Sequence, residues 1–145
     1  MVGGTLYPAE SGADIMNIPM MNPTKKRTVQ PIVSVKPIII AVDFDGTLCE
    51  NKYPEIGTPK REMIELMKRR KAMGDKIILW TCRSGKSLDD AVGWCASKGL
   101  YFDEVNENSP EEIDKWQSNP RKVGADVYID DKALNPNSIP EWWFE

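Results

Sequence analysis

Two short runs of apolar residues constrain the fold of this chain more than any other feature. Residues 38–42 read Ile-Ile-Ile-Ala-Val, and residues 77–80 read Ile-Ile-Leu-Trp. Continuous apolar runs of this length are typical of strands that are buried on both faces of a parallel sheet. Each run is followed by polar residues and then by a stretch with helical apolar spacing. Because this order implies parallel strands joined by right-handed crossovers, the chain is predicted to be an α/β protein with helices on both faces of the sheet.

Capping residues predict where the helices begin and end. Thr58-Pro59 is expected to begin the first helix, as N-cap and first helical residue, and Gly74 to end it. Ser87 and Asp90 have the spacing of a capping box, which predicts a second helix that ends at Gly99.

The second half of the chain is predicted to add two strands and a short helix. The strands are expected over residues 101–105 and 127–129, and the helix is expected to begin at Ser109-Pro110. In parallel sheets, ligands bind beyond the carboxyl ends of the strands, near the point where the strand order reverses. The residues that directly follow each strand are therefore the place to look for chemistry.

Composition excludes several classes of function. The 145 residues fit one domain, and the net charge of −3 provides no general positive field for nucleic acid. The chain has no histidine, which excludes Ser-His-Asp and Cys-His catalysis and zinc sites with histidine ligands. It also has no secretory signal, no apolar run of membrane-spanning length and no C-x-x-C among its three cysteines. We therefore expect a soluble cytoplasmic protein with reduced thiols and no membrane partner.

Residues 1–36 differ from the rest of the chain. They contain four prolines and a Gly-Gly pair, and their apolar residues follow no sustained period. We predict an irregular N-terminal arm over residues 1–36 and a folded domain over residues 37–145. A solvated linker and a partner-binding tail are both open interpretations of the arm.

Carboxylates gather at two of the predicted strand ends. Asp43 and Asp45 follow the first strand, and residues i and i+2 of an extended chain point to the same side. Asp130 and Asp131 follow the last strand. Four carboxylates so placed would repel one another unless a cation lies between them, and oxygen ligands favour Mg²⁺ over zinc or copper.

The strand ends also carry a resemblance to a known family. The residues Asp43-Phe44-Asp45-Gly46-Thr47 resemble the DxDGT motif of the haloacid dehalogenase (HAD) superfamily of phosphatases. Thr81 is similar to the second motif of that family, Lys122 to the third, and Ile129-Asp130-Asp131 to the fourth. The four motifs occur in the family's order and span residues 38–134. The resemblance implies a three-layer Rossmann-like core.

The resemblance implies a role for each of these residues. Asp43 is expected to be the nucleophile that forms an aspartyl-phosphate, and Asp45 the general acid and base. Thr81 is expected to bind the phosphate, and Lys122 to keep Asp43 ionised, with Lys115 as the competing lysine. Mg²⁺ is expected to be held by Asp43, by the backbone carbonyl of Asp45, and by Asp130 or Asp131, directly or through water.

The predicted site has no cap domain, because only about ten residues separate the first strand from its helix. An open site would accept large or varied phosphomonoesters. Nucleotides, polynucleotide 3′-phosphate ends, sugar phosphates and phosphoproteins are all candidate substrates, and the oligomeric state is open. The alternative from another class is a catalytically idle module that binds phosphate or metal and uses the arm for assembly with a partner. The presence of both Asp43 and Asp45 argues against that alternative.

Overall fold

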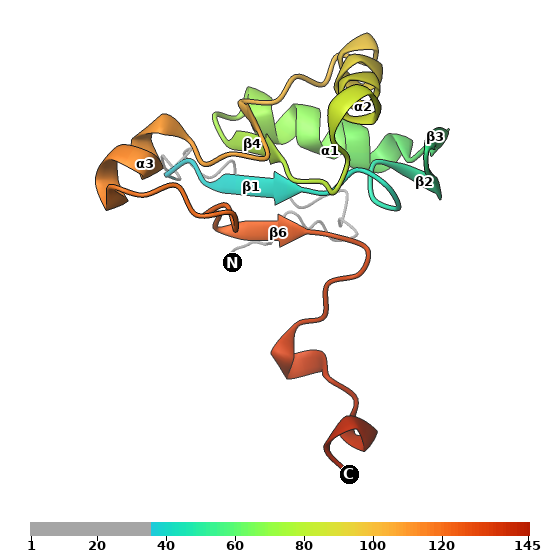
Figure 1. Cartoon of the computed structure of the whole chain (residues 1–145), viewed down its shortest axis with the longest axis vertical. Coiled ribbons are helices and arrows are strands. Elements are labelled where there is room, and N and C mark those ends of the chain that lie inside the picture. Colours follow the sequence, from blue (N-terminus) through green and yellow to red (C-terminus); the bar gives the residue numbers. More distant parts are fainter. Residues whose placement is uncertain (1–35) are drawn as a thin grey trace, which may run out of the picture. The chain divides into compact units, whose positions relative to one another are not determined.

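The computed structural model describes residues 36–145, which form an α/β unit around a four-stranded parallel sheet (Figure 1). The strand order is β5-β4-β1-β6. The strands are β1 (Ile39–Val42), β4 (Lys76–Leu79), β5 (Glu104–Val105) and β6 (Val127–Ile129). The two apolar runs form β1 and β4 at the centre of the sheet, which confirms that prediction. Apart from Lys36, the arm predicted for residues 1–36 lies outside the described residues.

One face of the sheet is covered by two helices. Helices α1 (Arg61–Ala72) and α2 (Gly85–Ser97) both lie on the same side of the sheet (Figure 1). Alternate strand residues point toward them, as the period of an extended chain requires. The core that results contains residues from β1, β4 and both helices: Ile40, Val42, Ile77, Leu79, Ile64, Met67, Ala91 and Cys95.

The opposite face is covered more thinly. Ala41 and Ile78 point to this side and pack with Val123, which belongs to the segment between α3 (Pro110–Trp116) and β6. Helix α3 is seven residues long and has no buried residue. The expectation of helices on both faces is therefore met in part: among residues 36–145, an irregular segment builds most of the third layer.

The largest difference from the sequence prediction lies between β1 and α1. Thr58 and Pro59 do not begin the helix; they end β3 (Glu55–Pro59), which pairs antiparallel with β2 (Cys49–Lys52). Helix α1 begins two residues later, after Lys60, which makes no side-chain capping hydrogen bond. The residues between β1 and α1, for which no strand was predicted, thus include a β-hairpin, and their number leaves no room for a cap domain.

The remaining boundaries are mostly as predicted. Gly74 and Gly99 follow their helices with φ of 104° and 84°, a conformation that favours glycine. Ser87 does not cap α2, because the N-cap is Ser84 and the Ser87 hydroxyl donates to the Ser84 carbonyl at 2.9 Å. The Ser109 hydroxyl accepts from the Glu112 N–H at 3.3 Å, which confirms the predicted cap of α3.

Two 3₁₀ helices, Pro136–Ser138 and Glu141–Phe144, follow β6. Within the part of the chain that the structure describes, each helix is too short or too polar to cross a membrane.

Candidate active site

The strand order reverses between β1 and β6. The chain runs from β1 to β4 and β5 on one side and then returns to place β6 on the other side of β1. The register continues past the strands, because the Asp43 N–H donates to the Ile129 carbonyl at 2.9 Å. Asp130 and Asp131 directly follow that residue. The aspartates of both strand ends therefore meet at the switch point, where parallel sheets bind ligands.

Three carboxylates form an acidic group at this point. Asp43, Asp130 and Asp131 each offer an oxygen that lies within 4.8 Å of the others, with Asp43 half-buried and its two partners exposed. Burial, followed by the Asp130 charge and by the hydrogen bond and charge of Asp131, raises the pKa of Asp43 to about 6. The donor set consists of carboxylate oxygens, which fits Mg²⁺. Two neighbouring carboxylates also leave the group with negative charge that a cation would compensate.

The Gly46-Thr47 pair of the DxDGT motif brings β6 close to β1. Gly46 has φ of 86°, and a Cβ built there would overlap the Asp131 carboxylate. The buried Thr47 hydroxyl accepts from the Asp131 N–H at 3.1 Å. The left-handed backbone conformation favours glycine, a side chain there would have to displace the Asp131 carboxylate, and the Thr47 hydroxyl fixes the backbone of Asp131.

Thr81 lies two residues after the end of β4, and Trp80 between them donates its N–H to the Val42 carbonyl at the end of β1. The Thr81 N–H donates to Asn106 Oδ1 at 2.8 Å, and its hydroxyl oxygen accepts from the Arg83 N–H at 3.1 Å. Among residues 36–145 the hydroxyl donates to no protein acceptor, so its proton is available for a ligand oxygen. Asn106, with φ of 56°, was not predicted as a site residue, although an Asn after a short strand is a common signal for a left-handed turn.

A hollow of about 930 Å³ opens beside the acidic group. Its lining includes Asp43, Asp130, Lys122, Trp80 and Tyr128. The Lys122 Nζ lies 5.2 Å from the centre of the Tyr128 ring, and within residues 36–145 no ion pair joins it to Asp43. Lys115, the competing lysine, lies on α3 over the Trp116 ring and does not line the hollow. Lys122 therefore lines the same hollow as Asp43, whereas Lys115 does not.

A second hollow, of about 620 Å³, lies on the side of the acidic group that faces the start of α1. Its lining includes Gly46, Thr47 and Asp131 from the strand ends and Lys60 and Arg61 from the start of α1. Asp130 lines both hollows.

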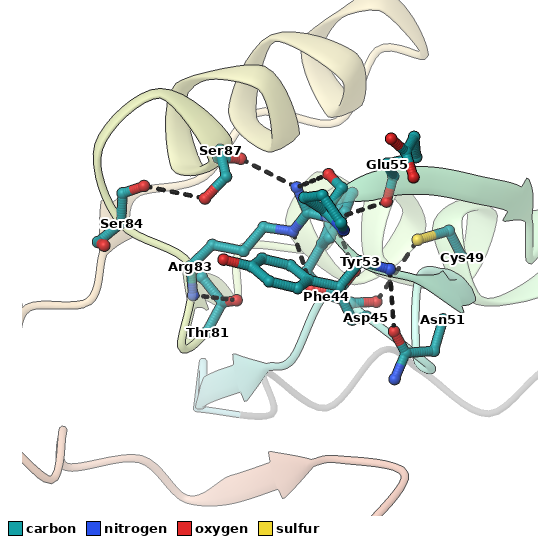
Figure 2. A network of polar contacts seen from close by, with 11 residues as sticks. Phe44, Asp45, Cys49, Asn51, Tyr53, Glu55, Thr81, Arg83, Ser84 and Ser87 are labelled. Atoms are coloured by element: carbon teal, nitrogen blue, oxygen red, sulfur yellow. Dashed lines mark hydrogen bonds and ion pairs between the residues drawn. The ribbon is translucent and has the colours of Figure 1, made fainter.

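The Asp45 carboxylate lies outside the group of three. Both of its oxygens accept hydrogen bonds from Arg83, each at 2.8 Å (Figure 2). Sequence reasoning missed Arg83, which lies two residues after Thr81. The only signal was an arginine at a strand end opposite a strand-end aspartate, and such a signal does not identify which carboxylate the arginine binds.

The chain is similar to a solved structure of a conserved protein from Bacteroides thetaiotaomicron. The two sequences are 40% identical, the match covers 75% of this chain and 86% of that chain, and the TM-score is 0.61. No protein-family model matches the chain, and no curated protein matches it. At this identity and coverage, the chain belongs to the same family as the conserved Bacteroides thetaiotaomicron protein.

Proposed function

We propose that this protein is a magnesium-dependent phosphomonoesterase of HAD type, which acts through an aspartyl-phosphate intermediate. The observation that carries the proposal is the group formed by Asp43, Asp130 and Asp131 at the switch point of the sheet. A half-buried carboxylate beside two others has an electrostatic cost that a divalent cation would remove. Asp43, Asp130 and Asp131 would hold the ion, together with the backbone carbonyl of Asp45. When bound, Mg²⁺ supplies positive charge that offsets the repulsion between a carboxylate and a phosphate dianion.

The first half of the reaction transfers the phosphoryl group to the protein. An Asp43 carboxylate oxygen forms a bond to phosphorus, and the bond between phosphorus and the leaving oxygen breaks. The protonated Asp45 carboxyl gives its proton to that oxygen, so an alcohol leaves and Asp45 becomes a carboxylate. The Thr81 hydroxyl and the Lys122 ammonium bind phosphate oxygens and stabilise the charge on them.

The second half regenerates the protein. A water oxygen forms a bond to phosphorus, and its proton passes to the Asp45 carboxylate. The bond between phosphorus and the Asp43 oxygen breaks, which releases inorganic phosphate and an ionised Asp43. Both halves use the Asp45 carboxyl, which gives a proton to the leaving oxygen in the first half and takes one from water in the second.

We expect the site to be open, because only the hairpin of residues 49–59 lies between β1 and α1. We propose small phosphorylated molecules as substrates, with nucleotides and polynucleotide 3′-phosphate ends among the candidates. Lys60 and Arg61, beside the second hollow, are cations that a further anionic group of such a substrate could contact.

The decisive experiment is hydrolysis of a chromogenic aryl phosphate with and without Mg²⁺. Wild type should turn over only with the metal, and Asp43→Asn should lower kcat by on the order of 10³-fold or more, because the nucleophile is lost while the shape is kept. Asp114→Asn, an exposed carboxylate on α3, is the matched control and should leave kcat unchanged. A folded wild type that hydrolyses neither the aryl phosphate nor a panel of nucleotides and sugar phosphates would favour the idle binding module.

A further inference from the structure

Arg83 is a buried cation that joins three segments of the chain. Its side chain is 1% exposed, and its Nε and Nη2 groups donate to the two oxygens of Asp45. Its remaining N–H groups donate to backbone carbonyls of Pro54 at 3.1 Å, Glu55 at 2.9 Å and Ser87 at 3.2 Å. One guanidinium therefore binds the loop after β1, the turn of the hairpin and the first turn of α2.

Two aromatic rings lie against the guanidinium, in the cluster drawn in Figure 2. The centres of the Phe44 and Tyr53 rings lie 5.0 Å and 5.1 Å from the Arg83 guanidinium carbon. Phe44 is fully buried and belongs to the core, whereas Tyr53 is 61% exposed and belongs to the hairpin turn. The hydrogen bond to Asp45 is the main cause that raises the pKa of Arg83, so the cation is firmly charged.

We propose that Arg83 is a positioning residue that fixes the Asp45 carboxyl in place and ties its orientation to the turn of the β2–β3 hairpin. This inference rests on the function proposed above. Asp45 is separated from Arg83 by 38 residues in the sequence, and its side chain remains 16% exposed, so a ligand can still reach it. The guanidinium is planar and binds a carboxylate through two parallel hydrogen bonds, which sets the direction of the carboxyl as well as its distance.

The chemistry of Asp45 explains why such a partner is useful. In the first half of the reaction the carboxyl loses its proton to the leaving oxygen, and the negative charge that develops already faces a buried cation. In the second half the carboxylate takes a proton from water. The two accepting oxygens seen in the structure are those of the ionised form, and one oxygen can keep its bond to Arg83 while the other carries a proton.

The proposal also links the orientation of Asp45 to the turn of the β2–β3 hairpin. The turn at Tyr53-Pro54 carries an exposed ring, and this Tyr53 ring lies against the guanidinium that binds Asp45. Because the Pro54 and Glu55 carbonyls bind the same guanidinium as Asp45, displacement of the turn changes the hydrogen bonds that hold the acid. The hairpin and the acid are thus predicted to act together.

The test compares two substrates that differ in their need for a general acid. The leaving group of 4-nitrophenyl phosphate departs without a proton, whereas that of ethyl phosphate needs one. Arg83→Gln should lower kcat on ethyl phosphate by about 10-fold more than on 4-nitrophenyl phosphate. For Asp45→Asn the difference between the two losses of kcat should be larger still. Arg83→Lys should recover part of the loss on ethyl phosphate, because it keeps the charge but not the two parallel bonds.

Two further variants separate positioning from general damage. Tyr53→Ala removes an exposed ring and should leave the protein folded. It should lower kcat on ethyl phosphate by about 3-fold more than on 4-nitrophenyl phosphate, because the turn is loosened while Asp45 keeps its partner. Arg70→Gln breaks an ion pair with Asp75, which lies directly before β4 at the amino end of that strand, and should lower kcat on neither substrate. If Arg83→Gln does not fold, Arg83→Lys and Tyr53→Ala carry the test.

The outcomes are distinct. Equal losses on both substrates in the Arg83 and Tyr53 variants would overturn the positioning role while leaving the phosphatase proposal intact. Wild type without turnover on either substrate would overturn the phosphatase proposal, and with it the role of Arg83.

Discussion

The two aspartates of the DxDGT motif lie two residues apart but have opposite environments. Asp45 is mostly buried and has both oxygens paired with a buried arginine. Asp43 is half-buried and faces two more carboxylates, and its pKa is raised to about 6 by burial and by Asp130 and Asp131. The charge of Asp45 is compensated by Arg83 of the same chain. Asp43 belongs to a group of three carboxylates whose negative charge no ion pair within the described residues compensates.

The difference separates a carboxylate that the chain compensates by itself from a group that we expect to depend on a cation. A carboxylate with a buried partner is held in one orientation whether or not substrate is bound. A group of unpaired carboxylates gains stability only when a cation arrives from solution. We therefore expect the two halves of the motif to respond differently to metal, mutation and pH.

Removal of metal should have the largest effect. Chelation with EDTA is expected to lower kcat/KM by on the order of 10³-fold or more, because the acidic group then repels the phosphate dianion, and added Mg²⁺ should restore it. Asp130→Asn and Asp131→Asn should each raise the Mg²⁺ concentration needed for half-maximal activity, by about 10-fold or more. The larger increase identifies the direct ligand, a choice that the sequence left open. Activity that persists in EDTA would contradict the expectation that the acidic group depends on a cation.

Loss of Arg83 should have the largest effect on stability. Arg83→Gln removes a buried cation and leaves the Asp45 carboxylate, which is 16% exposed, without its partner. The loss of a partner in such a pair typically costs about 3–5 kcal/mol of the free energy of unfolding. Lys86→Gln is the control, because it breaks an ion pair with Asp90 in which both side chains are exposed. Urea unfolding measures the loss of stability in each variant. A loss for Arg83→Gln no larger than for Lys86→Gln would show that Asp45 is not held by a structural ion pair.

The same contrast explains what the sequence could predict. The strands β1 and β4 and the meeting of Asp43 with Asp130 follow from apolar runs and the geometry of parallel sheets, so local pattern was sufficient. The start of α1 was predicted wrongly at Thr58-Pro59, because a plausible cap was weighed without the pairing of β3 with β2. Tertiary pairing overrides a local capping signal.

The partner of Asp45 could not be predicted for a related reason. An acidic cluster is visible in a sequence because its members have one chemistry and follow strands. The pair of Asp45 and Arg83 depends on a turn after β4 and on a hairpin that supplies two carbonyls, and neither has a sequence signature. The acidic group was therefore predictable, and the ion pair of Asp45 with Arg83 was not.

Lys122 offers an intermediate test. Lys122→Ala is expected to lower kcat/KM by about 10²-fold, because a cation that lines the hollow beside Asp43 stabilises the charge on the phosphoryl group. Lys115→Ala should have no effect, since that lysine lies on α3 over the Trp116 ring. Both variants should unfold at the urea concentration of wild type. A greater loss for Lys115→Ala would reverse the assignment of the lysine.

The smallest expected effect concerns stability and pH. Since the pKa of Asp43 rises from 3.8 to about 6 on folding, the folded state binds the proton more tightly than the unfolded state between these values. The free energy of unfolding therefore falls as pH rises from about 4 to about 6, and it stays lower above that range. Because Asp43 is half-buried, solvent screening reduces the loss to about 1 kcal/mol.

Asp43→Asn removes this loss, since the amide is neutral at every pH. In EDTA at about pH 7.5 the variant should be more stable than wild type by about 1 kcal/mol, and at about pH 4 the two should be equal. Mg²⁺ should reverse the order at neutral pH, because only wild type keeps the full set of ligands and a metal that binds the folded state stabilises it. Urea unfolding in the two buffers, with Asp114→Asn as the control, measures these differences. An Asp43→Asn variant that is less stable than wild type in EDTA at neutral pH would mean that the acidic group is already compensated within the chain, as Asp45 is.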